Sequence, residues 1–263
     1  MASSKREREL ARMRAERQAA RRAEAEARRR ARRNTVLGVI AGVAAVAVVV
    51  AVLVTTTGGG SKKKDTLASQ PTAASSTPAP GTCSYTSAGT AAKKVTGTPP
   101  AKPEVKGQVK VTLATNRGTI GLSLDGAKAP CTVGSFTFLA GQKYFDGTSC
   151  HRLTTSGIYV LQCGDPSGTG SGGPGYQFAD ENLTGATYPR GTVAMANAGP
   201  GTNGSQFFLV YKDTQLPPSY TPFGTITSGL DVLAQVAKAG VAGQGGDGKP
   251  KLPVTIKKAT VSS

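Results

Sequence analysis

The sequence predicts a mainly β fold: a closed antiparallel β-barrel capped by two α-helices and preceded by one transmembrane helix. Short runs in which apolar and polar residues alternate recur through residues 107–263. In the same region two stretches, 132–140 and 230–239, have apolar residues at helical spacing. Upstream, residues 36–54 are apolar and uncharged. Many short strands with two separated helices are typical of a barrel plugged by helices, and residues 107–263 can bury one sizeable core.

Turn residues separate the expected strands. Val109, Val111 and Leu113 alternate with polar residues, and the turn at 116–118 returns the chain into a second strand, which makes a hairpin. Gly141 suits the C-terminal end of the first helix. The predicted strands are 109–113 and 120–124 in this hairpin, two more in a second hairpin within 148–164, then 192–196, 205–210 and 253–261.

The N-terminal part of the chain predicts where the domain is placed. Residues 1–35 form a basic tail, with 13 Lys and Arg against 5 Asp and Glu in residues 1–33. Residues 36–54 are 19 uncharged residues, roughly enough to span a ~30 Å hydrocarbon core. The positive-inside rule keeps the tail in the cytoplasm and sends the domain across the cytoplasmic membrane. A cleaved signal peptide is the main alternative, but the long basic region and the lack of an A-x-A site after the apolar run favour an uncleaved anchor.

The charge of the chain is concentrated in this tail. The net charge is +17, whereas residues 107–263 hold 12 basic and 8 acidic residues, a net of +4. The basic tail suits a charge anchor, with anionic lipid or nucleic acid as the alternative contacts. We therefore expect no nucleic-acid partner for the folded domain.

Residues 55–106 are predicted to be a linker, because they are rich in Gly, Ser, Thr, Ala, Pro and Lys. Cys83 is the exception, and we expect it to pin this segment to the domain. The four cysteines include no C-x-x-C pair and the chain has one histidine, which argues against a structural zinc site. An even number of cysteines fits disulfides if the domain lies outside the cytosol.

Residues 191–209, GTVAMANAGPGTNGSQFFL, predict a concave site lined by backbone groups. The stretch reads as strand, tight loop and strand, with small side chains in the loop. Side chains alternate along the second strand, so Gln206 and Phe208 share one face while Phe207 takes the other. One phenylalanine can then fill the core while the other joins an amide at the surface.

Two other motifs are rejected or left open. The glycines at 168–173 fit G-x-G-x-x-G, but Pro174 and Gly175 follow, where a dinucleotide site needs a helix. His151 lacks a nucleophile motif and is more simply a structural residue. Arg152 is either a surface ion-pair partner or a cation that projects over a pocket.

Several blocks of this chain resemble cyclophilin-type peptidyl-prolyl isomerases. These blocks are MANAGP-x-TNGSQFF in 195–208, the histidine-arginine pair followed by YVLQCGD in 148–165, GTGSGGPGYQFADEN in 168–182 and QLPPSYTPFG in 215–224. The resemblance extends over about 107–261. It implies an eight-stranded antiparallel barrel capped by two helices, and cis–trans isomerisation of X–Pro bonds without a metal or cofactor.

The resemblance also implies roles for particular residues. Arg152 would be the catalytic residue, and Gln162 and Gln206 would orient the substrate or Arg152. Ala196, Asn197 and Ala198 would line the peptide groove. The walls of the proline pocket would be Tyr159, Val160, Phe208, Leu216 and Tyr220, where Tyr220 replaces the usual histidine. The turn after Arg152 is about two residues longer than in well-known members, so Ile158 remains the alternative to Tyr159.

The predicted hairpin places Cys150 on the strand of Arg152 and Cys163 on the partner strand. A Cys150–Cys163 disulfide would tie these strands and leave Cys83 to pair with Cys131, although four cysteines allow three connectivities. Two functions remain in view. The first is a membrane-anchored isomerase, with a monomeric domain that acts on proline-containing peptides or unfolded exported proteins. The second is a non-catalytic module of the same fold that binds proline-containing peptides or serves as a scaffold.

Overall fold

A computed structural model describes residues 81–262 of the chain. The predicted basic tail, the predicted transmembrane segment 36–54 and the first part of the predicted linker lie outside these residues. Neither of the two helices within 81–262 has the length and apolar character of a membrane span.

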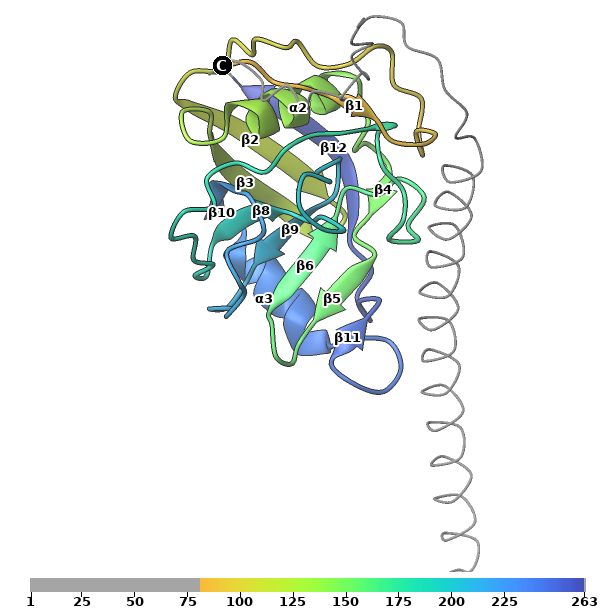
Figure 1. Cartoon of the computed structure of the whole chain (residues 1–263). Helices are drawn as coiled ribbons and strands as arrows, with labels where there is room; N and C mark the ends of the chain where they lie inside the picture. The colour runs from red at the N-terminus through yellow and green to blue at the C-terminus, as the bar shows by residue number, and fades with distance from the viewer. Residues whose placement is uncertain (1–80, 263) are drawn as a thin grey trace, which may run out of the picture. The chain divides into compact units, whose positions relative to one another are not determined.

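Most strands belong to one strongly curled antiparallel sheet (Figure 1). Its order is β11-β5-β6-β9-β8-β10-β3-β2-β12-β4. The bounds are β2 Gln108–Thr115, β3 Gly118–Asp125, β4 Thr148–Ser149, β5 Arg152–Thr154, β6 Val160–Cys163, β8 Thr192–Met195, β9 Phe207–Val210, β10 Pro222–Ser228, β11 Asp247–Gly248 and β12 Thr255–Ser262.

One bent segment of the chain connects the edge strand β4 to β5, which lies next to the opposite edge strand β11. β4 pairs with β12, β5 pairs with β6, and only Cys150 and His151 separate β4 from β5. The predicted mainly β fold is confirmed, but in place of the expected closed barrel of eight strands the described residues form one curled sheet of ten strands. The difference arises because one strand is split into β4 and β5, and because the two-residue β11 adds to an edge.

The two predicted helices are confirmed as α2, Pro130–Gly141, and α3, Leu230–Ala239. They lie at opposite ends of the curled sheet (Figure 1). Phe136 of α2 packs in the core against Phe145 and Phe207, at ring-centroid distances of 4.7 and 5.3 Å. Phe207 is fully buried there, while Phe208 belongs to a separate apolar cluster. The predicted opposite placement of the two phenylalanines is therefore confirmed.

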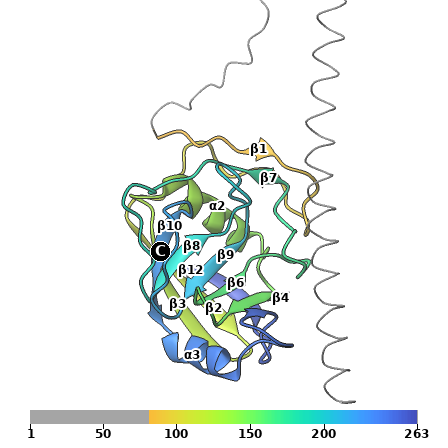
Figure 2. The same ribbon diagram turned by 60° about the horizontal axis from the view of Figure 1, so that its bottom comes forward.

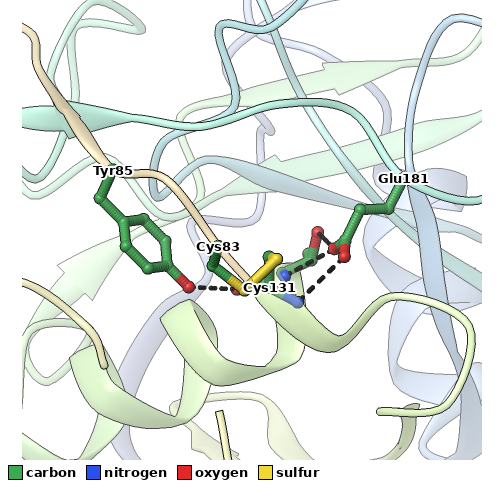
Figure 3. The surroundings of a disulfide bond; sticks show 5 residues. Cys83, Tyr85, Cys131 and Glu181 are labelled. Atoms are coloured by element: carbon green, nitrogen blue, oxygen red, sulfur yellow. Dashed lines mark hydrogen bonds between the residues drawn. A yellow bond between two sulfur atoms is a disulfide. The ribbon is translucent and has the colours of Figure 1, made fainter. Parts of the chain in front are cut away.

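Residues 81–106, which the sequence assigned to a linker, lie against the domain. Within them β1, Thr86–Ser87, pairs with β7, Tyr176–Gln177, as a second small sheet (Figure 2). The Cys83–Cys131 disulfide fastens this segment to the start of α2 (Figure 3). The second disulfide joins Cys150 to Cys163. Both predicted disulfides are confirmed, and the folded unit begins upstream of residue 107.

The start of α2 is capped by a residue from a distant part of the chain. Its N-cap residue Ala129 makes no side-chain capping bond. Instead, the Glu181 carboxylate accepts hydrogen bonds from the backbone N–H groups of Cys131 and Thr132, at 3.0 and 2.8 Å (Figure 3). A carboxylate at a helix N-terminus satisfies free N–H groups and interacts favourably with the helix dipole. The same helix end therefore carries both the disulfide and the cap.

Candidate functional site: an arginine and amide network beside an apolar cluster

Arg152 is held by a partner from the neighbouring strand. β11 pairs with β5 so that Asp247 lies opposite Thr154, two residues from Arg152. The Asp247 carboxylate accepts hydrogen bonds from Arg152 Nε at 2.8 Å and Nη2 at 2.7 Å. These hydrogen bonds raise the pKa of Arg152 above its ordinary value and lower the pKa of Asp247. The guanidinium is cationic and oriented, while 40% of the Arg152 side chain remains exposed.

A series of side-chain amides continues from Arg152 to the glycine-rich loop, residues 165–178. Arg152 and Gln162 are paired across β5 and β6, and Nη1 donates to Gln162 Oε1 at 3.2 Å. Gln162 Nε2 donates to Gln206 Oε1 at 2.8 Å. Gln206 Nε2 then donates to the carbonyl oxygens of Gly170 and Gly172, at 3.0 and 2.9 Å. The structure therefore joins the arginine and both predicted glutamines in one hydrogen-bonded network.

An apolar cluster lies beside this network, because Phe208 is the β9 residue paired with Gln162. The ring of Tyr220 packs edge-on against Phe208 at a centroid distance of 5.7 Å. The cluster contains four of the residues predicted to form a proline pocket. Its buried members are Val160, Tyr188, Ala194, Phe208 and Val210, and Ile158, Ala186, Ala196, Leu216 and Tyr220 pack against them while partly exposed.

Tyr159 lies outside this cluster, so its assignment to the pocket is corrected in favour of Ile158. The Tyr159 ring packs against Tyr211 at a centroid distance of 6.1 Å, and Lys212 Nζ lies 4.3 Å from its centre. Ile158 packs against the cluster instead. Alternate residues of an extended segment point to the same face, so Ile158 and Val160 face one way and Tyr159 the other.

A cavity of about 660 Å³ adjoins the glutamines. Ala196, Asn197 and Ala198 line it, as the predicted groove residues. The Asn197 side chain is itself engaged, since Nδ2 donates to the Ser219 carbonyl oxygen at 2.7 Å. No Asp, Glu, Lys, Arg or His is among the described residues that line the cavity. The complete lining is Ala88, Gly89, Thr90, Gln162, Gly170, Ser171, Gly172, Gly173, Pro174, Tyr176, Gln177, Ala196, Asn197, Ala198, Thr202, Gly204, Ser205 and Gln206.

The glycine-rich loop is folded around the buried carboxylate of Asp165. One oxygen accepts from the Ser167 N–H and hydroxyl, and the other accepts from the N–H groups of Gly170 and Gly172, at 2.7 and 3.1 Å. Burial acts to raise the pKa of Asp165, but these hydrogen bonds outweigh it and lower the pKa to about 2. A Cβ atom at Gly172 would collide with the carboxylate. The ionised Asp165 therefore fixes the carbonyl groups that hold Gln206.

His151 is a structural residue at the bend between β4 and β5. Neither of its ring nitrogens has a hydrogen-bond partner among the described residues, and both are buried. Burial lowers the pKa of His151, despite the opposing charge of Asp165. The side chain is therefore neutral near pH 7, and it takes no part in the Arg152 network.

Comparison with known families locates these features in a common domain. The family described as "Cyclophilin type peptidyl-prolyl cis-trans isomerase/CLD" matches residues 110–261. This chain belongs to that family. The matched region runs from β2 to β12 and includes both helices, Arg152 and the whole amide network. It leaves out residues 81–109.

Individual cyclophilins agree with this assignment. The chain is 57% identical over 175 residues to the probable peptidyl-prolyl cis-trans isomerase B of Mycobacterium tuberculosis, covering 61% of this chain and 56% of the relative. It is 53% identical over 179 residues to the isomerase B of Mycobacterium leprae, covering 60% of this chain and 61% of the relative. The match thus spans little more than half the length of these relatives. The probable isomerase A of Mycobacterium bovis is 41% identical over 168 residues, with 57% of this chain and 91% of the relative covered.

A solved cyclophilin has the same fold. The crystal structure of a cyclophilin-type isomerase from Cryptosporidium parvum superposes with a TM-score of 0.54 at 32% identity, covering 59% of this chain and 98% of that chain. A second structure of that protein was determined in the presence of the dipeptide Ala-Pro, and it superposes with a TM-score of 0.53.

Two features of the site were not predicted from the sequence. Asp247 lies in a Gly-rich stretch 95 residues from Arg152, and only the pairing of β11 with β5 brings the two side chains together. Ala88, Gly89 and Thr90 belong to the segment that the sequence assigned to a linker, yet they line the cavity. Cys83 was the one signal that this segment would lie on the domain.

Proposed function

We propose that this chain is an active peptidyl-prolyl cis-trans isomerase. The observation that carries the proposal is the fixed Arg152 guanidinium next to the apolar cluster around Phe208. Rotation about an X–Pro bond crosses a barrier of ~18–20 kcal/mol, which arises from amide resonance. A catalyst of this rotation must bind the twisted amide more tightly than either planar form. A cation beside an apolar site for the proline ring meets this requirement without a nucleophile.

The hydrogen bonds of Arg152 leave donors free for the substrate. A guanidinium has five N–H groups. Asp247 uses two of them and Gln162 uses one, which leaves one N–H on each terminal nitrogen. We assign these two donors to the prolyl carbonyl and to the prolyl nitrogen, whose lone pair becomes localised as the amide twists. Donors fixed before the reaction stabilise this developing charge without reorganising.

The surroundings of Arg152 suit a proline-containing peptide. The partly exposed side chains of Ile158, Leu216 and Tyr220 extend the buried cluster to the surface, where a pyrrolidine ring can pack. Ala196 packs against this cluster and also lines the cavity, so the two sites are continuous. A peptide whose proline lies on the cluster would place a neighbouring residue in the cavity. The Ala-Pro dipeptide that was present with the Cryptosporidium parvum cyclophilin is likewise a peptide that contains a proline.

We further propose that this domain acts outside the cytoplasmic membrane on exported proteins that are folding. The basic tail and the apolar segment 36–54 support a single-pass anchor with the N-terminus in the cytoplasm. The two disulfides also support this location, since disulfides persist in oxidising compartments. Protease added to intact cells is expected to remove the domain from the membrane fraction. A domain protected until the cells are lysed would contradict this location.

The isomerase proposal is tested with the full-length chain in mild detergent. The assay follows cis-to-trans conversion of a short Ala-Pro peptide, coupled to a protease that cleaves only the trans form. Arg152→Ala is expected to lower kcat/KM by about 10²-fold or more, the usual effect of removing a transition-state donor. Arg190→Ala is the control, because Arg190 is exposed and lies outside the network.

The result also separates the two candidate functions. A wild-type chain that gives no rate above the uncatalysed background eliminates the isomerase. If that chain still binds the peptide by calorimetry, the non-catalytic binding module is the better description. If Arg152→Ala keeps the wild-type rate, the role assigned to Arg152 is wrong.

A further inference from the structure

The N-terminal segment 82–92, named here the strap, runs along the glycine-rich loop. β1 in the strap pairs with β7 (Figure 2). Beyond β1, the Ala88 N–H donates to the Gly175 carbonyl oxygen at 2.9 Å, and the Ala92 N–H donates to the Gly173 carbonyl oxygen at 2.9 Å. From residue 86 to residue 92 the strap therefore follows the loop through backbone hydrogen bonds.

Both ends of the strap are fastened to the domain. At its start, the Cys83–Cys131 disulfide is reinforced by the Tyr85 hydroxyl, which donates to the Cys131 carbonyl oxygen at 2.9 Å (Figure 3). The Tyr85 ring also packs edge-on against Tyr176 at 5.4 Å. Just beyond the other end, Lys93 Nζ donates to the carbonyl oxygen of Lys143 at 2.6 Å and to that of Asp146 at 2.7 Å. The middle of the strap is thus held in a fixed place.

The glycine-rich loop is shaped to receive the strap. Gly175 has a φ of +85°, which favours glycine, and a Cβ atom there would lie 3.2 Å from the backbone nitrogen of Ala91. Between its fastened ends the strap contributes Ala88, Gly89 and Thr90 to the lining of the cavity. These three residues are otherwise exposed, so their free surface faces the cavity or solvent. The strap is therefore one wall of the groove.

This wall lies outside the domain that defines the family. The family match begins at residue 110, so residues 88–90 add surface to a groove whose other lining residues all lie within the matched region. A cavity of about 660 Å³ can hold a large side chain. Its described lining has no charged side chain to pair with a charged residue of the peptide, and burial of an unpaired charge is unfavourable.

We propose that the strap is a specificity element, which makes the groove select a large uncharged side chain, aromatic or amide, close to the proline of the peptide. The inference rests on the proposed isomerase function, because the groove is continuous with the site for the proline ring. Contacts with residues 88–90 stabilise a large side chain, whereas an alanine at the same position leaves the groove unfilled. A glutamate at that position loses solvation without gaining a partner.

The test compares proline peptides that differ at one position within two residues of the proline. Phenylalanine, glutamine, alanine and glutamate are placed there in turn, and kcat/KM is measured with the full-length chain. At one position the wild type is expected to prefer phenylalanine or glutamine over alanine and glutamate by about tenfold or more, the usual range for filling a pocket. Thr90→Trp fills the groove and is expected to remove this preference. Thr98→Trp is the matched control, since Thr98 is exposed and outside the cavity lining, and it should keep the preference.

A folded Thr90→Trp protein that keeps the wild-type preference overturns the proposal, and so does a wild type with no preference at any position. If Thr90→Trp does not fold, the Cys83→Ser/Cys131→Ser double variant decides by the same measure, because it releases the start of the strap. Calorimetric binding of the same peptides separates the two proposals. Selective binding without turnover would remove the isomerase function and keep the strap as a specificity element.

Discussion

Replacing Asp247 by asparagine tests whether this carboxylate positions Arg152, the residue that we propose to be catalytic. Asn has one oxygen and one NH₂ group, so it cannot accept from both Nε and Nη2 of Arg152 as Asp247 does at 2.8 and 2.7 Å. Ordering a long side chain costs up to ~2 kcal/mol of rotamer entropy. Because Gln162 still binds Nη1, we expect a loss of about 1 kcal/mol in transition-state stabilisation, or roughly fivefold in kcat/KM.

The stability of the protein should change much less than its activity. The side chains of Arg152 and Asp247 are 40% and 55% exposed, so solvent screens the ion pair. Exposed ion pairs contribute about 0–1 kcal/mol to the free energy of unfolding. A fall in kcat/KM with a nearly constant free energy of unfolding would therefore distinguish positioning of Arg152 from a structural role.

The assay is the coupled measurement on an Ala-Pro peptide, with urea unfolding of each variant in parallel. Asp247→Glu keeps the carboxylate and is expected to recover part of the lost rate. Asp231→Asn is the control, because Asp231 is an exposed aspartate on α3, away from the network. The positioning role is refuted if Asp247→Asn has wild-type kcat/KM, or if Asp247→Glu is no better than Asp247→Asn.

Three further predictions concern stability, and urea unfolding measures each of them. Glu181→Gln should lower the free energy of unfolding by about 1 kcal/mol, since it weakens the cap of α2; an unchanged midpoint would contradict the cap. Asp165→Asn should cost about 1–3 kcal/mol, because an amide nitrogen would face the N–H groups of the glycine-rich loop. In the wild type the pKa of about 2 for Asp165 implies stability that is present above pH ~4 and lost as the pH falls towards 2, and Asp165→Asn should lack this step. His151 has a pKa lowered by burial, so the unfolded chain takes up its proton first and stability should fall as the pH drops below about 6.5. His151→Asn should therefore reduce the fall in stability below about pH 6.5, and an equally steep fall would exclude His151 as its cause.

Local patterns were sufficient to predict much of the domain. Alternating apolar residues predicted β2 and β3, helical spacing predicted α2 and α3, and the opposite faces of Phe207 and Phe208 followed from strand geometry. The same alternation separates Tyr159 from Ile158, but the length of the preceding turn shifted the assignment by one residue. An error of one position in a strand moves a side chain to the other face.

Contacts between distant segments could not be predicted in this way. Asp247 and Thr90 lie in stretches of small and polar residues without a periodic pattern, and both reach the site through short backbone pairings. The composition of residues 55–106 predicted a linker. A segment that binds a domain through backbone hydrogen bonds needs few apolar side chains, so its composition resembles that of a linker. The Glu181 cap of α2 could not be predicted either, because the N–H groups that it caps are about 50 residues away in the sequence.

The disulfide connectivity has a consequence for the order in which the bridges form when the chain emerges with its N-terminus first. Each bridge joins cysteines that are neighbours in the order of the sequence, Cys83 with Cys131 and Cys150 with Cys163. When the first 131 residues have emerged, the only two thiols available form the native pair. Cys150 and Cys163, which are 13 residues apart, are then the remaining pair. An order of emergence that starts at the N-terminus therefore favours the native bridges over the other two connectivities.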